Sequence, residues 1–287
     1  MHVVQFVIDG LLLGGVYAAV GIGFALVFGI MNVINLAHGA LIMLGAYVTF
    51  WLWKLAGIDP FLTIPVSMVC IFTLGWLIQR FLINYVIRAP MLVTFLMTFG
   101  LGLLIVDVAL NVFSADNRSV STPLAGAPIQ FAGITIPLVH FITLGIALLL
   151  TGLLGLYLSR TRTGNAIRAT SMDLDAARLV GIKIGRIYAL TFAIGGAAAG
   201  AAGSLIILNY SMNPGGGEFY TLIGFVVCVL GGLGSVSGAL VGGLLFGVVQ
   251  SLSQAFLGPS FQNAIAFGLL VVILLIRPSG ILGKSTA

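Results

Sequence analysis

Charged side chains are scarce in this sequence. Its 287 residues include 12 Lys and Arg and 7 Asp and Glu, together 7% of the chain, whereas soluble domains carry about 25%. A soluble protein of this length could not cover its surface with so few charges. The composition therefore excludes a soluble enzyme, a nucleic-acid-binding protein and a disordered chain.

Cysteine is also scarce, because only Cys70 and Cys228 occur, and both fall within apolar runs. The sequence has no CxxC motif and no Cys/His cluster, so we expect neither a metal site nor a disulfide framework. The first residues lack a basic segment, and no small-residue cleavage site follows a short apolar core. We therefore expect the first apolar run to be retained as a membrane span.

Apolar residues and glycine are abundant, at 60% of the chain and 39 residues. The apolar runs are continuous and about 20 residues long, the length that a helix needs to cross a bilayer. Strands of a membrane barrel would instead alternate apolar and polar residues. The sequence predicts an all-α fold, a polytopic membrane helical bundle with about eight to ten transmembrane segments and broken helices. The apolar runs are 8–30, 36–56, 61–87, 91–113, 136–158, 187–209, 219–233, 236–256 and 261–277.

Basic residues predict how these segments are oriented, since cytoplasmic loops are enriched in Lys and Arg. Half of the basic residues lie in the connection 159–186, which we therefore assign to the cytoplasm. Nine alternating spans then place the N-terminus outside and the C-terminus in the cytoplasm, with residues 114–135 as an external loop. The further basic residues expected on the cytoplasmic side are Arg80, Arg88, Arg277 and Lys284, and those expected outside are Lys54 and Arg118.

The connection 159–186 is longer than two spans need and carries the pattern of a short helix. Ser171 or Asp173 can cap its N-terminus, and Gly181 can end it. Asp173 lies in the first turn and Arg178 in the last, as the helix dipole favours. Leu174 and Ala177 would share one small apolar face, which Val180 could extend. The loop either fixes the membrane topology as a solvated segment or docks a soluble partner.

A cluster of polar residues interrupts the apolar pattern between the first two runs. Asn32, Asn35, His38 and Gly39 lie close together, and Asn35 and His38 would share a helix face. Polar groups at membrane depth must be paired or line a wet cavity. These residues either tie the broken backbone together or line a solute pathway, as broken helices do in transporters.

Two acidic residues are candidates for a role near the outer side of the membrane. Asp107 is the acid that lies well inside an apolar run, and Glu218 follows a Pro-Gly-rich turn. We expect Asp107 to be interfacial or hydrogen-bonded. Glu218 would either meet an external protein or be solvated.

Several motifs in this sequence match a known family. The cytoplasmic loop contains GNAIR at 164–168 and AARLVGI at 176–182, followed by the small-residue helix TFAIGGAAAGAAG at 191–203. Further matches are GIMNVINLAHG at 29–39, GGLGSVSG at 231–238 and RPSGILG at 277–283. Together these motifs resemble the LivH-type permease subunits of the branched-chain amino acid ABC importer family. Family members often carry an acid after the Ala-His-Gly element, where this chain has Ala40.

The resemblance implies a membrane-spanning permease subunit, not an enzyme, in a bacterial cytoplasmic (inner) membrane. Residues 1–287 would form a single transmembrane permease domain whose loop 159–186 is the coupling loop. The implied partners are a second permease subunit, identical or paralogous, two cytoplasmic ATPase subunits and an external substrate-binding protein. The implied substrate-pathway residues are Asn32, Asn35, His38 and Gly39, and those that couple to the ATPase are Asp173, Leu174, Ala177, Arg178 and Gly181.

No cofactor is expected on this chain, and ATP and Mg would bind the partner ATPases. The tail Gly283-Lys284-Ser285 imitates the end of a P-loop, but Pro278 stands where the first glycine of that motif belongs. Relatives carry branched-chain amino acids, urea, short amides or aromatic acids, and the sequence leaves these solutes open. The alternative function is a proton- or ion-coupled secondary transporter that uses Asp107 and His38.

Overall fold

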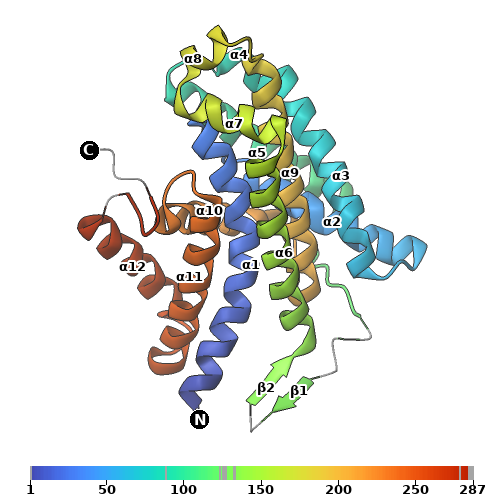
Figure 1. Ribbon diagram of the computed structural model, residues 1–287. Helices are drawn as coiled ribbons and strands as arrows, with labels where there is room; N and C mark the ends of the chain where they lie inside the picture. Colours follow the sequence, from blue (N-terminus) through green and yellow to red (C-terminus); the bar gives the residue numbers. More distant parts are fainter. Residues whose placement is uncertain are drawn as a thin grey trace.

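The computed structural model describes residues 2–87, 89–122, 124, 128–131, 134–277 and 279–283. Arg88, Pro278 and Lys284, on which some of the expectations rest, lie outside the described residues. The described chain is a helical bundle with one small hairpin (Figure 1). Its elements are α1 (His2–Met31), α2 (His38–Ala56), α3 (Pro60–Ile78), the π-helical turn η1 (Gln79–Ile83), α4 (Asn84–Val86), α5 (Met91–Phe113), β1 (Pro128–Phe131), β2 (Ile134–Pro137), α6 (Leu138–Arg160), α7 (Arg162–Met172), α8 (Leu174–Leu179), α9 (Ile184–Asn209), the 3-10 turn η2 (Pro214–Gly216), α10 (Gly217–Gly231), α11 (Val236–Leu257) and α12 (Gln262–Ile276).

Each of the nine apolar runs corresponds to one of these helices, except that the run 61–87 covers α3, η1 and α4 together. Among the described residues, eight helices are long and apolar enough to cross a membrane, and the apolar helix Asn263–Ile276 is shorter. The prediction of a polytopic bundle with eight to ten segments is confirmed. The antiparallel hairpin β1–β2, which pairs Ile129 with Ile136, was not predicted and departs from an all-α fold.

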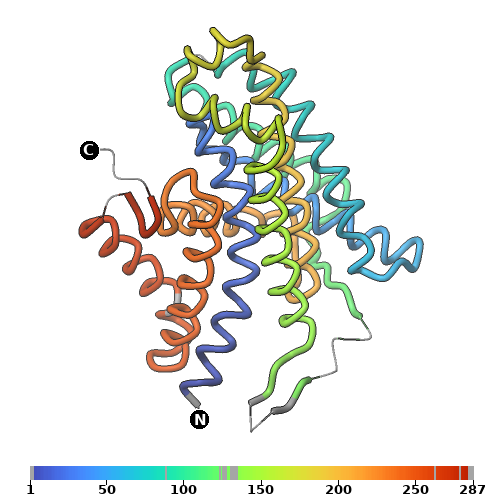
Figure 2. Tube along the Cα trace, in the orientation of Figure 1, coloured from blue at the N-terminus to red at the C-terminus, as the bar shows by residue number. Residues whose placement is uncertain are grey.

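Helix α1 runs through the middle of the bundle, with α11 on one side and α6 and α9 on the other (Figures 1 and 2). Glycines allow the close approach of α1 and α11. A Cβ added at Gly14 would lie 2.6 Å from the Leu244 Cα, and one added at Gly10 would lie 2.6 Å from the Val248 Cα. Rows of small residues therefore bring these backbones into contact, as they do in other membrane bundles.

Helices α2, α3 and α9 pack together around a small buried polar network. The Thr49 hydroxyl donates to the Ser204 hydroxyl at 2.8 Å and accepts from the Thr63 hydroxyl at 3.0 Å. The Ser67 hydroxyl lies within hydrogen-bond distance of the carbonyl oxygens of Gly45 and Gly200, at 3.1 and 3.0 Å. These bonds link three helices and satisfy polar groups that lipid could not.

The predicted interruption between the first two spans is confirmed. Helix α1 ends at Met31, and Asn32 adopts a left-handed backbone conformation with φ of 50°. The following stretch 33–37 turns back into the protein, where Val33, Asn35 and Ala37 are buried. Helix α2 then begins inside the bundle, so that non-helical backbone is shielded from lipid by protein.

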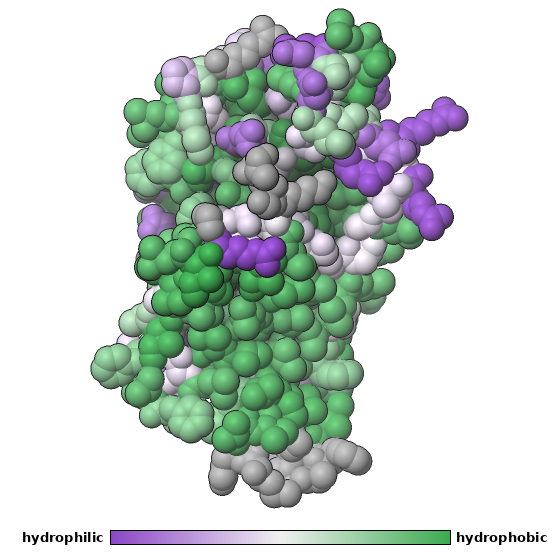
Figure 3. Space-filling model, turned by 60° about the vertical axis from the view of Figure 1, so that its left-hand side comes forward, coloured by the Kyte–Doolittle hydropathy of each residue, from purple (hydrophilic) through white to green (hydrophobic). Residues whose placement is uncertain are grey.

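The two ends of the bundle differ in polarity. The N-terminus and the β1–β2 hairpin lie at one end, and α7 and α8 lie at the opposite end (Figure 1). Hydrophilic side chains gather toward the α7–α8 end, and a broad hydrophobic surface covers the part below it (Figure 3). Large apolar side chains, such as Leu62, Leu149 and Leu275, are exposed on several of the described helices. Such a surface is what a helical bundle presents to lipid.

Candidate functional site

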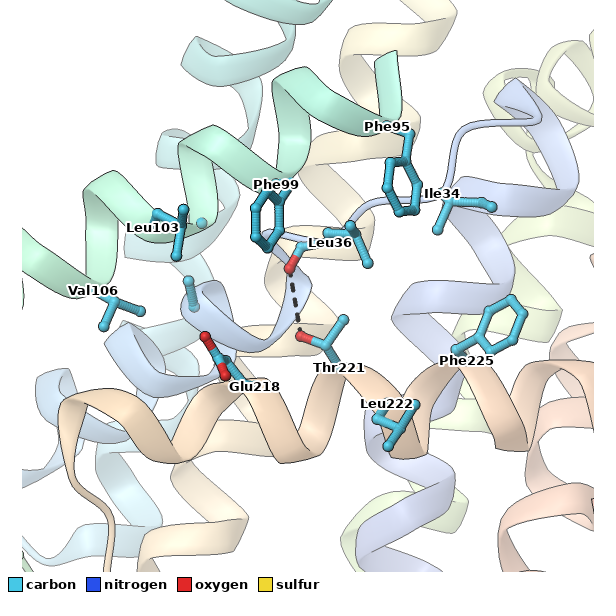
Figure 4. Close-up of a pocket in the computed structure, with 12 residues that line it drawn as sticks. Ile34, Leu36, Phe95, Phe99, Leu103, Val106, Glu218, Thr221, Leu222 and Phe225 are labelled. Carbon is cyan, nitrogen blue, oxygen red and sulfur yellow. Dashed lines mark hydrogen bonds between the residues drawn. The ribbon is translucent and has the colours of Figure 1, made fainter. Parts of the chain in front are cut away.

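A groove of about 490 Å³ lies where the broken backbone meets α2, α5 and α10. We call it the helix-break groove. The side chains that line it are mostly aliphatic or aromatic (Figure 4). Its lining residues are Ile34, Leu36, Ala40, Phe95, Phe99, Gly102, Leu103, Val106, Glu218, Thr221, Leu222 and Phe225.

Two threonines hold the broken backbone that forms one wall of this groove. From α5, the buried Thr98 hydroxyl accepts from the Leu36 N–H at 3.2 Å and lies 3.0 Å from the Ile34 carbonyl oxygen. From α10, the Thr221 hydroxyl accepts from the Gly39 N–H at 2.8 Å and donates a longer bond of 3.4 Å to the Leu36 carbonyl oxygen. The broken segment is therefore bonded from both sides by residues distant in sequence, and no local sequence signal predicted either threonine.

The predicted pathway residues surround the groove without lining it. His38 is 1% exposed, and its Nε2 lies 3.1 Å from the Val20 carbonyl oxygen of α1, while its ring meets Phe24 edge to face. Asn35 is also buried, and Asn32 is exposed at the end of α1. None of these side chains is among the groove-lining residues. Asn35 and His38 therefore lie inside the bundle next to the helix break, and Asn32 lies at its exposed edge. Contact of these residues with a solute remains a prediction.

Gly39 has a clear structural role at the start of α2. A Cβ added there would overlap the Gly217 carbonyl oxygen and the Thr221 hydroxyl of α10. Any larger residue would push α10 away from the break. Gly39 therefore brings α10, with Glu218 and Thr221, up to the groove.

The two acidic candidates lie in different places. Glu218 projects from the first turn of α10 into the groove, where its carboxylate points toward α5 (Figure 4). Asp107 is exposed on α5 next to the groove-lining Val106, and its backbone carbonyl oxygen accepts from the Asn111 side chain at 2.8 Å. The His38 ring lies against the Val20 carbonyl oxygen of α1, and no hydrogen bond among the described residues joins it to Asp107, the other residue of the secondary-transporter alternative.

The predicted short helix of the 159–186 loop is present as α8. The Asp173 carboxylate caps it by accepting from the N–H groups of Asp175 and Ala176, each at 2.9 Å. Arg178 pairs with Asp175 at 3.0 Å in the exposed part of the helix. Gly181 ends the turn with φ of 84°, a conformation that favours glycine. Asp173 as the cap and Gly181 as the end of the helix are both confirmed.

The orientation of α8 differs from the prediction. Ala177 is 3% exposed, so its side chain faces the rest of this chain, and Leu174 is half-buried beside it. Leu179, at 89% exposed, points outward together with Val180 and Met172. The prediction that Ala177 lies on the outward apolar surface is wrong, because the small side chain lets α8 rest on its neighbours α7 and α9. The exposed apolar surface is formed by Met172, Leu179 and Val180.

In comparisons with known proteins, the chain is similar to permeases of branched-chain amino acid transport systems. A family model described as "Branched-chain amino acid transport system / permease component" matches residues 6–274. The chain is 32% identical to the high-affinity branched-chain amino acid transport system permease protein BraD of Pseudomonas aeruginosa, covering 99% of this chain and 96% of that protein. It is also 32% identical to the LivH protein of the corresponding system in Escherichia coli, with the same coverage of both chains. A probable LivH of Methanocaldococcus jannaschii is 28% identical and covers 91% of this chain and 87% of that protein.

Proposed function

Because this chain belongs to the family of permease components of branched-chain amino acid transport systems, we propose that it carries a branched-chain amino acid through the helix-break groove. The chemistry of the groove's lining residues is the main support for this proposal. The walls of the groove are aliphatic and aromatic, and the groove also offers one carboxylate. An aliphatic amino acid presents the matching combination of an apolar side chain and a charged ammonium group, with its α-carboxylate directed away from the Glu218 carboxylate. Urea and short amides lack the apolar part, and aromatic acids lack the ammonium group.

The proposed assembly is an ABC importer in which this chain is one of two permeases. The permease alone forms a pathway and catalyses no reaction, and ATP with Mg is hydrolysed on two separate ATPase subunits. An external binding protein delivers the solute. In this arrangement residues 1–287 form a single transmembrane domain in a bacterial inner membrane, with the N-terminus outside and the C-terminus in the cytoplasm.

The separation of the two ends supports this orientation. The basic connection 159–186 forms α7 and α8, at the end opposite to the start of α1 and to the β1–β2 hairpin that follows residues 114–122. A cysteine placed at Arg168 is expected to react with an impermeant thiol reagent only from the cytoplasm, and one placed at Asn117 only from outside. Reaction of both from the same side would contradict the orientation.

The ATPase is proposed to dock on Met172, Leu179 and Val180 at the tip of the 159–186 loop. These side chains are exposed and apolar although they lie at the polar end of the bundle. An apolar helix surface that enters a groove of a partner is a common recognition mode. Leu179→Asp is expected to abolish co-purification of the ATPase while the permease still folds, and an unchanged complex would exclude this surface.

Uptake by the assembled complex tests the pathway directly. Leu103 on α5 lines the groove, whereas its neighbour Leu104 is exposed outside the groove. Leu103→Trp fills the groove and is expected to reduce leucine uptake at least tenfold, whereas the matched control Leu104→Trp keeps most of it. Equal uptake by the two variants would show that solute does not pass through this groove.

A further inference from the structure

The helix-break groove contains one ionisable side chain, the carboxylate of Glu218, among its twelve lining residues. Within the described ranges the two ion pairs are Arg118–Asp116 and Arg178–Asp175, so no described basic residue neutralises Glu218. The groove therefore carries a net negative charge on this chain.

The remaining polar group of the groove does not offset that charge. The Thr221 hydroxyl already accepts from the Gly39 N–H and lies in position to donate to the Leu36 carbonyl oxygen. Its single proton is thus directed to the backbone, so it offers no free donor to an anionic solute. The groove of this chain favours a cationic group and disfavours an anionic one.

The surroundings of Glu218 define what else the solute must contain. Across the groove from α10, the α5 side chains Phe99, Leu103 and Val106 form an apolar wall (Figure 4). Glu218 is exposed in this chain, so water reaches its carboxylate, but the apolar wall limits that screening on the side that faces α5 and strengthens the attraction for a cation there. An ammonium group attached to an aliphatic or aromatic body fits both features.

We propose that Glu218 is the specificity-determining residue of the groove and that it receives the ammonium group of an amino acid whose apolar side chain lies against α5. This inference rests on the proposed function and adds that the Glu218 carboxylate selects solutes by their charge. It excludes aromatic acids and other simple anions as solutes. Neutral amides and urea could donate hydrogen bonds to the carboxylate but carry no cationic charge, so they would gain less from it than an ammonium group does.

A second role for Glu218 must be separated from this one. An acidic residue in the first turn of a helix also stabilises the helix dipole, by about 0.3–1 kcal/mol at exposed positions. That role would affect folding but would not make the groove select cations. The decisive experiment therefore measures the charge selectivity of the groove itself.

Thiol modification provides such a measurement without any knowledge of the solute. Leu222 is exposed, lines the groove and lies one helix turn after Glu218. In the assembled complex with the exposed Cys70 changed to Ser, Leu222→Cys is treated with a trimethylammonium and a sulfonate methanethiosulfonate reagent. The ratio of the two reaction rates, relative to that of a free thiol, reports the local potential.

We expect the cationic reagent to be favoured, and Glu218→Gln to lower the rate ratio roughly three- to tenfold. A lost potential of about 0.5 to 1 kT per unit charge would do this, because the two reagents differ by two charges. Asp107→Asn removes the same charge from the neighbouring surface of α5 and is expected to leave the ratio unchanged. A ratio that does not respond to Glu218→Gln would overturn the proposal.

Leucine uptake then links charge selectivity to transport. Glu218→Gln is expected to reduce uptake at least tenfold with the ATPase still bound, Glu218→Asp to restore part of it, and Asp107→Asn to leave it unchanged. Reduced uptake of Glu218→Gln with an unchanged rate ratio would contradict the proposal, because it would indicate a packing role. If the unmodified complex carries no leucine, the proposed function fails, and the reagent ratio alone decides whether Glu218 makes the groove cation-selective.

Discussion

Helices α1 and α5 have equal mean hydropathy but very different surroundings. In the most apolar stretch of α1, 83% of the residues are buried, compared with 11% in that of α5. Hydropathy therefore identifies both as membrane spans and does not distinguish the central helix from the peripheral one. The difference lies in the small residues. A Cβ added at Gly10, Gly14 or Gly29 of α1 would meet the backbone of a neighbouring segment, whereas one added at Gly100 of α5 would meet nothing within 4 Å.

Although α5 is the more exposed helix, one of its faces is buried against the broken backbone and another lines the groove. Thr98 and Gly102 of α5 are buried against the broken backbone. Phe95, Phe99, Leu103 and Val106 line the groove. Residues that are exposed in this single chain therefore include two groups. Some would face lipid, and others would face the solute pathway or a second permease.

The largest expected effect concerns the close contact of α1 with α11. Gly14→Leu would force a side chain into a site where the Leu244 Cα lies 2.6 Å from the added Cβ. We expect a loss of about 3 kcal/mol in stability, since overpacking against backbone cannot be relieved by a rotamer change. Gly100→Leu on α5 is the matched control and should leave the apparent Tm of the purified protein nearly unchanged. Equal Tm values for the two variants would contradict the central position of α1.

A smaller effect is expected at the broken backbone. Thr221→Val removes the acceptor of the Gly39 N–H and leaves a buried donor without a partner. We expect a loss of about 1–3 kcal/mol, measured as a lower unfolding temperature. In the control Thr73→Val, the lost hydroxyl bonds only within α3 and is exposed, so little change is expected. A Thr221→Val protein as stable as this control would mean that the break does not depend on α10.

The smallest effect is expected at the cytoplasmic end. Asp173→Ala removes the cap of α8 and is expected to cost about 1 kcal/mol locally. Hydrogen exchange of the Asp175 and Ala176 amides should then be about fivefold faster. Asp175→Ala removes only the exposed pair with Arg178, which is worth about 0–1 kcal/mol. If both variants exchange equally, the cap does not hold the helix.

The sequence predicted the parts of this fold that depend on local pattern. The nine apolar runs correspond to nine helices, the polar residues at 32–39 mark a true interruption, and Asp173 caps α8 as expected. Each of these features follows from residues close together in the chain, so that hydropathy, capping and glycine positions were sufficient to find them.

The sequence could not predict what distant segments form together. The groove joins Ala40 to Thr221 and Glu218, about 180 residues apart, and no periodicity relates them. The orientation of α8 was predicted wrongly, because a six-residue helix has apolar residues on both faces and only its packing decides that Ala177 faces inward. The β1–β2 hairpin was missed since its strands have four residues each.

One face of α5, which includes Leu103, is proposed to line a water-filled solute pathway, whereas the adjacent Leu104 faces lipid. The most direct test compares Leu103→Cys with Leu104→Cys in the assembled complex, in a Cys70→Ser background, using a charged water-soluble thiol reagent. Leu103 lines the groove and Leu104 is the more exposed of the two. We expect the cysteine at 103 to react and leucine with the binding protein to slow the reaction, whereas the cysteine at 104 does not react. Reaction at 104 but not at 103, or equal rates that leucine does not change, would contradict it.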